Sequence, residues 1–68
     1  MLAMEGYDSN IELLMRRHYY VLSEKDRRHY AAVEAAKLGH GGVTYIADLF
    51  GCSRQTVATG LEELKKTT

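Results

Sequence analysis

A single glycine, Gly51, separates two apolar patterns that each repeat with the period of an α-helix. Before it, apolar side chains recur at i, i+3, i+4 and i+7, the spacing of one helical face, at Val43, Ile46, Ala47 and Phe50. After it, the Ser53 hydroxyl can accept a hydrogen bond from the free amides of a helix that begins at Arg54. The apolar stripe of this second helix consists of Val57, Leu61 and Leu64. Because Gly51 supplies the positive φ that ends a helix abruptly, the pattern predicts a helix-turn-helix.

The small residues of this unit support the same prediction. Two helices that cross steeply after a short turn must touch near Ala47, where a bulky side chain is not tolerated. Ala47, Gly51 and Val57 stand at relative positions 0, +4 and +10, a combination more specific than a hydrophobic pattern alone. The alternative is an ordinary helical hairpin in a small all-α domain, with no ligand for its outer face.

The first of two helices expected upstream covers residues 10–22. Ser9 and Glu12 have the spacing of a capping box, in which two side chains bond to backbone amides at the helix start. Apolar side chains follow with helical spacing and predict one buried face, formed by Ile11, Leu14, Met15, His18, Tyr19 and Leu22. We expect this helix either to complete the core or to form a contact between two copies, because an apolar stripe of this length is costly to leave in water.

The second upstream helix is expected over residues 24–38. Ser23, with Asp26 three residues later, marks its start, and Gly39 closes it. Its buried side is expected to consist of Tyr30, Ala31, Val33, Ala35 and Leu38. Four alanines at 31, 32, 35 and 36 predict the close approach of another helix. Because the chain contains no proline, one continuous helix through Ser23 is an alternative.

Together these elements predict one small all-α domain. We expect a bundle of about four helices, over 10–22, 24–38, 43–50 and 54–65, with Gly42 as the N-cap of the third. The domain is expected over residues 9–68, after a frayed arm at residues 1–8. A chain of 68 residues buries only about 60% of its unfolded surface, so the core should be small.

Charge and composition disfavour several classes of protein. Nine Lys and Arg balance nine Asp and Glu, whereas an autonomous DNA-binding domain is usually basic. A neutral module can leave most phosphate contacts to other parts of a larger assembly. No long apolar run occurs, and the N-terminus lacks a basic region followed by an apolar one, so we expect neither a membrane span nor a secretion signal. The single Cys52 excludes an internal disulfide, suits a small buried apolar position and fits a reduced, cytoplasmic setting.

No pattern typical of a catalytic or metal site occurs in the sequence. The strongest metal-ligand candidates are His18, His29, His40 and Cys52. They are separated by 11, 11 and 12 residues, and this matches no zinc-site spacing. We expect His18 to be a hydrogen-bonded core histidine on its apolar stripe, and the other two histidines to be exposed. No catalytic residue, metal or cofactor is expected, and the chain alone is not expected to be an enzyme.

The helix over 54–65 is the expected DNA-recognition helix, with double-stranded DNA as its partner. With Val57 at the centre of the buried face, a rotation of 100° per residue places Gln55 and Thr59 nearly opposite. Ala58 lies on the same outer side. Gln55 can pair with adenine through both ends of its amide, while Ala58 and Thr59 offer methyl groups to thymine.

Residues at the two helix starts are better placed for phosphate contacts. Ser53 and Arg54 begin the recognition helix, and Thr44 lies near the free amides that follow Gly42. Glu62 is poorly suited to lie beside phosphates, so it either reads cytosine or marks the turn at which the helix leaves the groove. The expected DNA-binding residues are therefore Thr44, Ser53, Arg54, Gln55, Ala58 and Thr59.

Several motifs of the chain resemble those of a known family. They are Leu-Ser-Glu-Lys-Asp-Arg-Arg at 22–28, Leu-Gly-His-Gly-Gly at 38–42, Ser-Arg-Gln-Thr-Val at 53–57 and Gly-Leu-Glu-Glu-Leu at 60–64. Over roughly residues 13–64, the chain resembles the N-terminal region of ISAzo-type insertion-sequence transposases. In that family the region precedes a nuclease domain of the DDE type, which cuts and joins DNA with divalent metal and has no counterpart in these 68 residues. The resemblance implies recognition of element ends or targeting to DNA, without the chemistry.

Two other functions remain open at this point. One is a helical interaction module that uses the helix-turn-helix only as a scaffold and forms a homodimer through Ile11, Leu14, Met15 and Leu22. The other is a small autonomous transcriptional regulator, which belongs to the same DNA-binding class.

Overall fold

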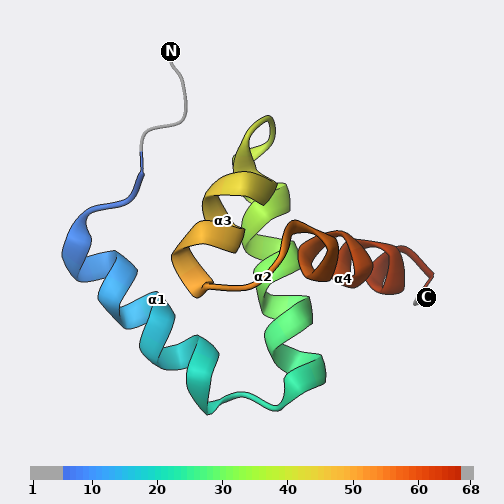
Figure 1. Cartoon of the computed structure of the whole chain (residues 1–68), viewed down its shortest axis with the longest axis horizontal. Coiled ribbons are helices and arrows are strands. Elements are labelled where there is room, and N and C mark those ends of the chain that lie inside the picture. The colour runs from blue at the N-terminus through green and yellow to red at the C-terminus, as the bar shows by residue number, and fades with distance from the viewer. Residues whose placement is uncertain (1–5, 67–68) are drawn as a thin grey trace.

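The computed structural model describes residues 6–66, which form four α-helices and contain no strand (Figure 1). The helices are α1 (Ser9–Val21), α2 (Glu24–Leu38), α3 (Gly42–Phe50) and α4 (Arg54–Lys66). The all-α prediction is confirmed, and each predicted helix boundary lies within one residue of the observed boundary. Residues 1–5 of the expected arm, and residues 67 and 68, lie outside the described part. Within residues 6–66, no helix is long and apolar enough to cross a membrane.

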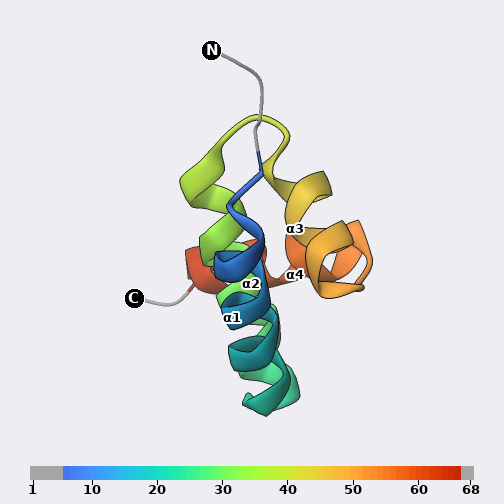
Figure 2. The ribbon, with the colours of Figure 1, turned by 90° about the vertical axis from the view of Figure 1, so that its left-hand side faces the viewer.

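Helices α2, α3 and α4 form a three-helix core in which α2 packs against both α3 and α4 (Figure 1). A short link joins the end of α1 to the start of α2, and the two helices diverge away from this link (Figure 1). In the side view of Figure 2, α1 lies in front of α2. The rings of Tyr19 and Phe50 stack with their centroids 4.3 Å apart, which joins α1 to α3. All four helices contribute to the core cluster, which consists of Met15, Tyr19, Ala31, Ala35, Ile46, Ala47, Phe50 and Val57.

The predicted break between α1 and α2 at Ser23 is confirmed. The Ser23 hydroxyl accepts a hydrogen bond of 3.2 Å from the backbone N–H of Asp26. The guanidinium of Arg27 donates to the carbonyl oxygens of Tyr19 and Tyr20, at 3.1 and 2.9 Å. Because the last carbonyls of a helix lack partners within that helix, Arg27 stabilises the end of α1 and favours two helices over a continuous one.

The predicted capping box at the start of α1 is wrong. Asp8, and not Ser9, precedes the helix, and no side chain caps this end with a hydrogen bond. The carboxylate of Glu12 instead accepts a hydrogen bond from the hydroxyl of Tyr45 in α3. A tertiary contact therefore replaces the local one that the spacing suggested.

Two helical glycines, Gly42 and Gly60, lie tightly against the backbone of α2. Gly42 is the first residue of α3, so its predicted role as N-cap is wrong, and Gly41 precedes the helix. A Cβ atom on Gly42 would lie 2.4 Å from the carbonyl oxygen of Ala35, and one on Gly60 would lie 2.5 Å from that of Arg28. Neither position leaves room for a side chain. The predicted close approach at the alanines of α2 is confirmed by burial of Ala31, Ala32 and Ala35, although Ala36 is exposed.

The predicted apolar face of α1 is only partly buried. Met15 and Tyr19 lie in the core, but Ile11 and Leu14 are 44% and 59% exposed. Figure 1 shows that α1 diverges from α2, so that α2 does not cover α1 along its whole length. Val33 was expected on the buried side of α2 and is 47% exposed, because α3 and α4 pack against other sides of that helix.

Two of the three histidine predictions are wrong. His18 is exposed, and its ring meets Tyr30 edge-on with the centroids 5.0 Å apart. His29 is half-buried, and its Nε2 atom lies 2.9 Å from a carboxylate oxygen of Glu63 in α4. His40 is exposed as predicted. The two errors have one cause, since helical spacing within one helix does not reveal how other helices pack against it. His18 is exposed because α1 diverges from α2, and His29 is half-buried because α4 packs against α2.

Candidate nucleic-acid interface

The turn between α3 and α4 has the predicted geometry. Gly51 ends α3 with φ 72° and ψ 29°, in the left-handed region. The backbone N–H groups of Gly51 and Cys52 both reach the carbonyl oxygen of Ala47, the latter at 3.0 Å. Ser53 accepts a hydrogen bond of 3.0 Å from the backbone N–H of Thr56. These bonds fix the direction in which α4 leaves the turn.

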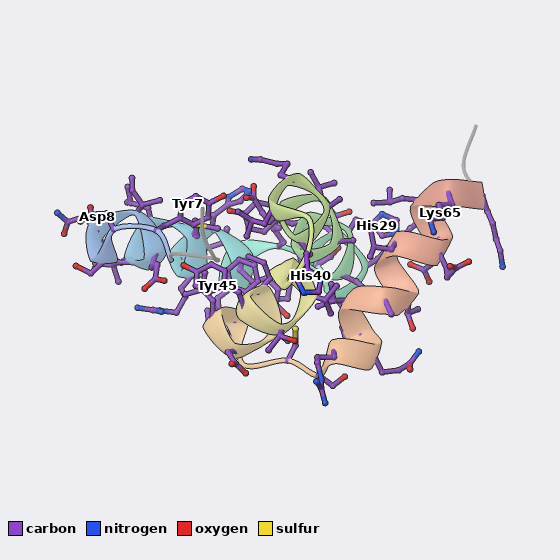
Figure 3. The ribbon with its side chains drawn as sticks, turned by 90° about the horizontal axis from the view of Figure 1, so that it is seen from above. Tyr7, Asp8, His29, His40, Tyr45 and Lys65 are labelled. Carbon is purple, nitrogen blue, oxygen red and sulfur yellow. The ribbon has the colours of Figure 1, made fainter. Side chains whose placement is uncertain are left out.

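Helix α4 is held against α2 by an apolar contact and an ionic one. Val57 is fully buried on the apolar side. On the ionic side, the carboxylate of Glu63 accepts two hydrogen bonds from the Arg28 guanidinium, at 2.9 and 3.1 Å. Glu63 also contacts His29, which lies between α2 and α4 in Figure 3. The hydrogen bonds from Arg28, and then from His29, lower the pKa of Glu63, while Glu63 raises the pKa of Arg28.

Helix α3 is held from its other side by α1. The hydroxyl of Tyr20 donates a hydrogen bond of 2.9 Å to the carbonyl oxygen of Phe50 at the end of α3. Near the start of α3, the Tyr45 hydroxyl donates to Glu12 and accepts a hydrogen bond of 2.9 Å from the backbone N–H of Tyr7. Figure 3 shows Tyr7 and Tyr45 close together, and burial followed by the bond to Glu12 raises the pKa of Tyr45. These contacts fix both ends of α3.

The cysteine of the turn packs against the core. Cys52 is half-buried rather than fully buried, and it is a free thiol. Tyr19 lies behind it, and burial, followed by a hydrogen bond with Cys52, raises the pKa of Tyr19 to about 12. The tyrosine and the cysteine therefore connect the turn to the core.

Four of the six predicted DNA-binding residues line one open hollow between the start of α3 and the start of α4. The hollow has a volume of about 750 Å³, and Ala47 and Cys52 contribute to its wall. The four predicted residues that line it are Thr44, Ser53, Arg54 and Gln55, of which Thr44 is half-buried or more open and the others are exposed. The other two predicted residues, Ala58 and Thr59, are half-buried on α4 and do not line the hollow.

Asp48 also lines this hollow and was not among the predicted residues. Its carboxylate is exposed on the face of α3 that is turned toward the start of α4. A negative charge at this place opposes phosphate binding, whereas the amides at the starts of the two helices favour it. Helical spacing could have placed Asp48 here, because it follows Thr44 by one turn of α3.

The outer face of α4 carries polar side chains that interact with one another. The amide nitrogen of Gln55 donates to the hydroxyl of Thr59 at 3.3 Å. Further along, Glu62 and Lys65 form an ion pair of 3.7 Å between two largely exposed side chains. Such surface pairs contribute little to stability, so Glu62 is free to turn toward a ligand.

Several basic side chains of the described residues bond to oxygens within the chain, and one of the unpaired ones lines the hollow. Arg54 is exposed at the start of α4 and forms no ion pair with any residue in the range 6–66. By contrast, four other cations bond to carbonyl or carboxylate oxygens: Arg27, Arg28, Lys37 and Lys65. The hollow is therefore lined by one unpaired arginine and lies beside the starts of two helices.

The described residues contain no group of three His, Cys, Asp or Glu side chains that could hold a metal ion. We also compared the chain with models of protein families, with curated proteins and with solved structures, and none of the three comparisons gives a match.

Proposed function

We propose that this chain is a sequence-specific DNA-binding module that inserts α4 into the major groove. The observation that carries the proposal is the hollow between the starts of α3 and α4, with Gln55 and Arg54 exposed beside it. A recognition helix must present its first turns to the base edges while the preceding helix crosses the backbone. The hydrogen-bonded turn at Gly51 and the contacts of both helices with the core support the proposal.

In this proposal the two helix starts bind phosphates. Arg54 and the hydroxyl of Ser53 contact one phosphate group, and Thr44 with the first amides of α3 contacts another. Neither contact depends on base sequence. Asp48 limits the strength of both, because its carboxylate repels a phosphate that enters the hollow.

Base selection belongs to the outer face of α4. Gln55 is exposed in the first turn and can pair with adenine, which offers one acceptor and one donor in the major groove. Ala58 and Thr59 expose only part of their side chains, which suits methyl contacts with thymine. Glu62 either accepts a hydrogen bond from the amino group of a cytosine or marks the turn at which α4 leaves the groove.

We place this module in the class of transposase DNA-recognition domains, on the strength of the motifs at 22–28, 38–42, 53–57 and 60–64. In this proposal the chain recognises DNA and performs no reaction by itself. A cytoplasmic setting belongs to the same proposal, since its only cysteine is a free thiol packed beside the core.

A homodimer is the second candidate, favoured by the exposure of Ile11 and Leu14 on α1. Met15 and Leu22, which share the predicted dimer face, are buried and half-buried within their own chain. A contact between two copies would therefore use Ile11 and Leu14. Sedimentation at micromolar concentration tests it, and a monomer at every concentration would eliminate this candidate.

The DNA proposal is tested by two substitutions with opposite signatures. Arg54→Ala should weaken binding to all duplexes alike and reduce the salt slope by about one. Gln55→Ala should lose roughly 1–3 kcal/mol of preference at one base position and leave non-specific binding intact. Fluorescence titration at two salt concentrations and selection from a random duplex library measure the two effects.

Arg17→Ala is the matched control, because Arg17 is an exposed arginine on α1 that does not line the hollow. It should change neither the affinity nor the selected sequences. Equal enrichment profiles for the wild type and Gln55→Ala would refute the orientation of α4. Absence of binding to any duplex at low salt would refute the proposal as a whole.

A further inference from the structure

The contact between Gln55 and Thr59 restricts the donors that α4 can offer to a base. The two residues are one turn apart on the outer face of α4, and the Gln55 Nε2 atom lies 3.3 Å from the Thr59 Oγ1 atom. Thr59 is half-buried, Gln55 is exposed, and the hydrogen bond between them lies at the surface. The threonine thus provides a nearby acceptor for one N–H of the glutamine side chain.

The hydrogen-bonding capacity of an amide explains why this restriction matters. A free glutamine amide has two N–H donors and one oxygen acceptor. It can meet adenine with one donor and one acceptor, or turn both donors toward N7 and O6 of guanine. When one N–H is bonded to Thr59, a single N–H and the oxygen remain. That pair matches adenine and does not match guanine.

We propose that Thr59 is a positioning residue that makes Gln55 select adenine over guanine at the base it contacts. This inference rests on the proposed function, because it assumes that the outer face of α4 lies in the major groove. It also changes the role expected for Thr59, whose hydroxyl is engaged with Gln55. Only its methyl group remains for a base.

The test compares two substitutions at the same position. Thr59→Val keeps the shape of the side chain and removes the hydroxyl, whereas Thr59→Ser keeps the hydroxyl. Duplexes that differ only in adenine or guanine at the base selected by Gln55 are titrated with each variant. Since a net hydrogen bond changes an equilibrium by about two- to tenfold, Thr59→Val should lower the adenine-to-guanine affinity ratio by that factor. Thr59→Ser should keep the wild-type ratio.

A second measurement needs no DNA. In the free protein, nuclear magnetic resonance order parameters of the Gln55 side-chain amide should fall in Thr59→Val and stay unchanged in Thr59→Ser. Thermal unfolding of both variants checks that α4 remains folded.

The outcomes separate this inference from the proposed function. If the wild type prefers adenine and Thr59→Val keeps the same adenine-to-guanine affinity ratio, the positioning role alone is overturned. A wild type without base preference, or one whose preference survives Gln55→Ala, overturns the proposed orientation of α4 and the positioning role with it. Loss of the ratio in Thr59→Val with retention in Thr59→Ser supports both.

Discussion

Replacement of Gly60 by alanine tests the distance between α4 and α2 directly. In an unobstructed helix the change stabilises, because alanine is the better helix former by about 0.8–1.0 kcal/mol. Here the added methyl group would lie 2.5 Å from the carbonyl oxygen of Arg28 and 3.1 Å from the Cβ atom of Ala32. Ordinary carbon contacts lie at about 3.5–4.0 Å, so α4 must move away from α2 by roughly 1 Å.

Overpacking of this kind typically costs about 1–3 kcal/mol, and a backbone atom cannot turn aside as a flexible side chain can. After the gain in helix propensity is subtracted, we expect Gly60→Ala to be less stable by up to about 2 kcal/mol. For a domain of this size each kcal/mol lowers Tm by about 4–8 °C. Circular dichroism during heating, repeated with urea at constant temperature, measures the loss.

Two controls isolate the steric cause. Glu62→Ala changes an exposed residue of the same helix and should stay within about 0.5 kcal/mol of the wild type. Addition of Ala32→Gly to Gly60→Ala should restore little stability, because the closest atom belongs to the backbone of Arg28. A Gly60→Ala protein that melts at or above the wild-type temperature would show that the two helices are farther apart than described.

The remaining predictions concern the turn, the ion pair and α1. Gly51→Val should destabilise by at least about 1–2 kcal/mol in urea titrations, because a β-branched residue resists the left-handed conformation; unchanged stability would mean that the turn lies elsewhere. The pKa of Glu63 is lowered in the folded chain, so its contribution to stability is complete above its unfolded pKa and lost as the pH falls through its folded pKa. Glu63→Gln should therefore flatten the acid limb of a plot of stability against pH, and a parallel curve would contradict this assignment. Met15→Asp should lower Tm strongly, since Met15 is only 9% exposed, whereas Leu14→Asp should leave the Tm of a monomer nearly unchanged.

The helix-turn-helix was predictable because its signals are local. The positive φ at Gly51 and the cap at Ser53 depend on residues within one helical turn, and both have the predicted geometry. Rotation about α4 from the buried Val57 also placed Gln55 correctly on an exposed face. Each of these steps uses only the geometry of a single helix.

The burial of α1 was less predictable because it depends on the angle between helices. Periodicity identifies an apolar face but not how wide a sector of it another helix will cover. Met15 and Tyr19 are buried, while Ile11 on the same predicted face is exposed. The steric role of Gly60 was hidden for a related reason. No residue near Gly60 in the sequence indicates that the backbone of Arg28 packs against Gly60.

The structure also gives a physical account of a neutral chain with a proposed DNA-binding face. Two arginines are engaged in holding the fold together, since Arg27 stabilises the end of α1 and Arg28 fixes α4 through Glu63. Lys37 and Lys65 pair with neighbouring carboxylates. Arg54 is therefore the cation that lines the hollow.

This distribution predicts a shallow dependence of DNA binding on salt. Each phosphate neutralised by a cation contributes about −0.9 to the slope of log K against log salt concentration. With Arg54 as the unpaired cation lining the hollow, and amides that carry only partial charge, we expect a slope of about −1 to −2. Titration of one duplex over a series of salt concentrations measures it. A slope steeper than about −5 would require several more cations at the DNA than the one that lines the hollow. The interface would then have to extend beyond the hollow, and the proposed contacts would be incomplete.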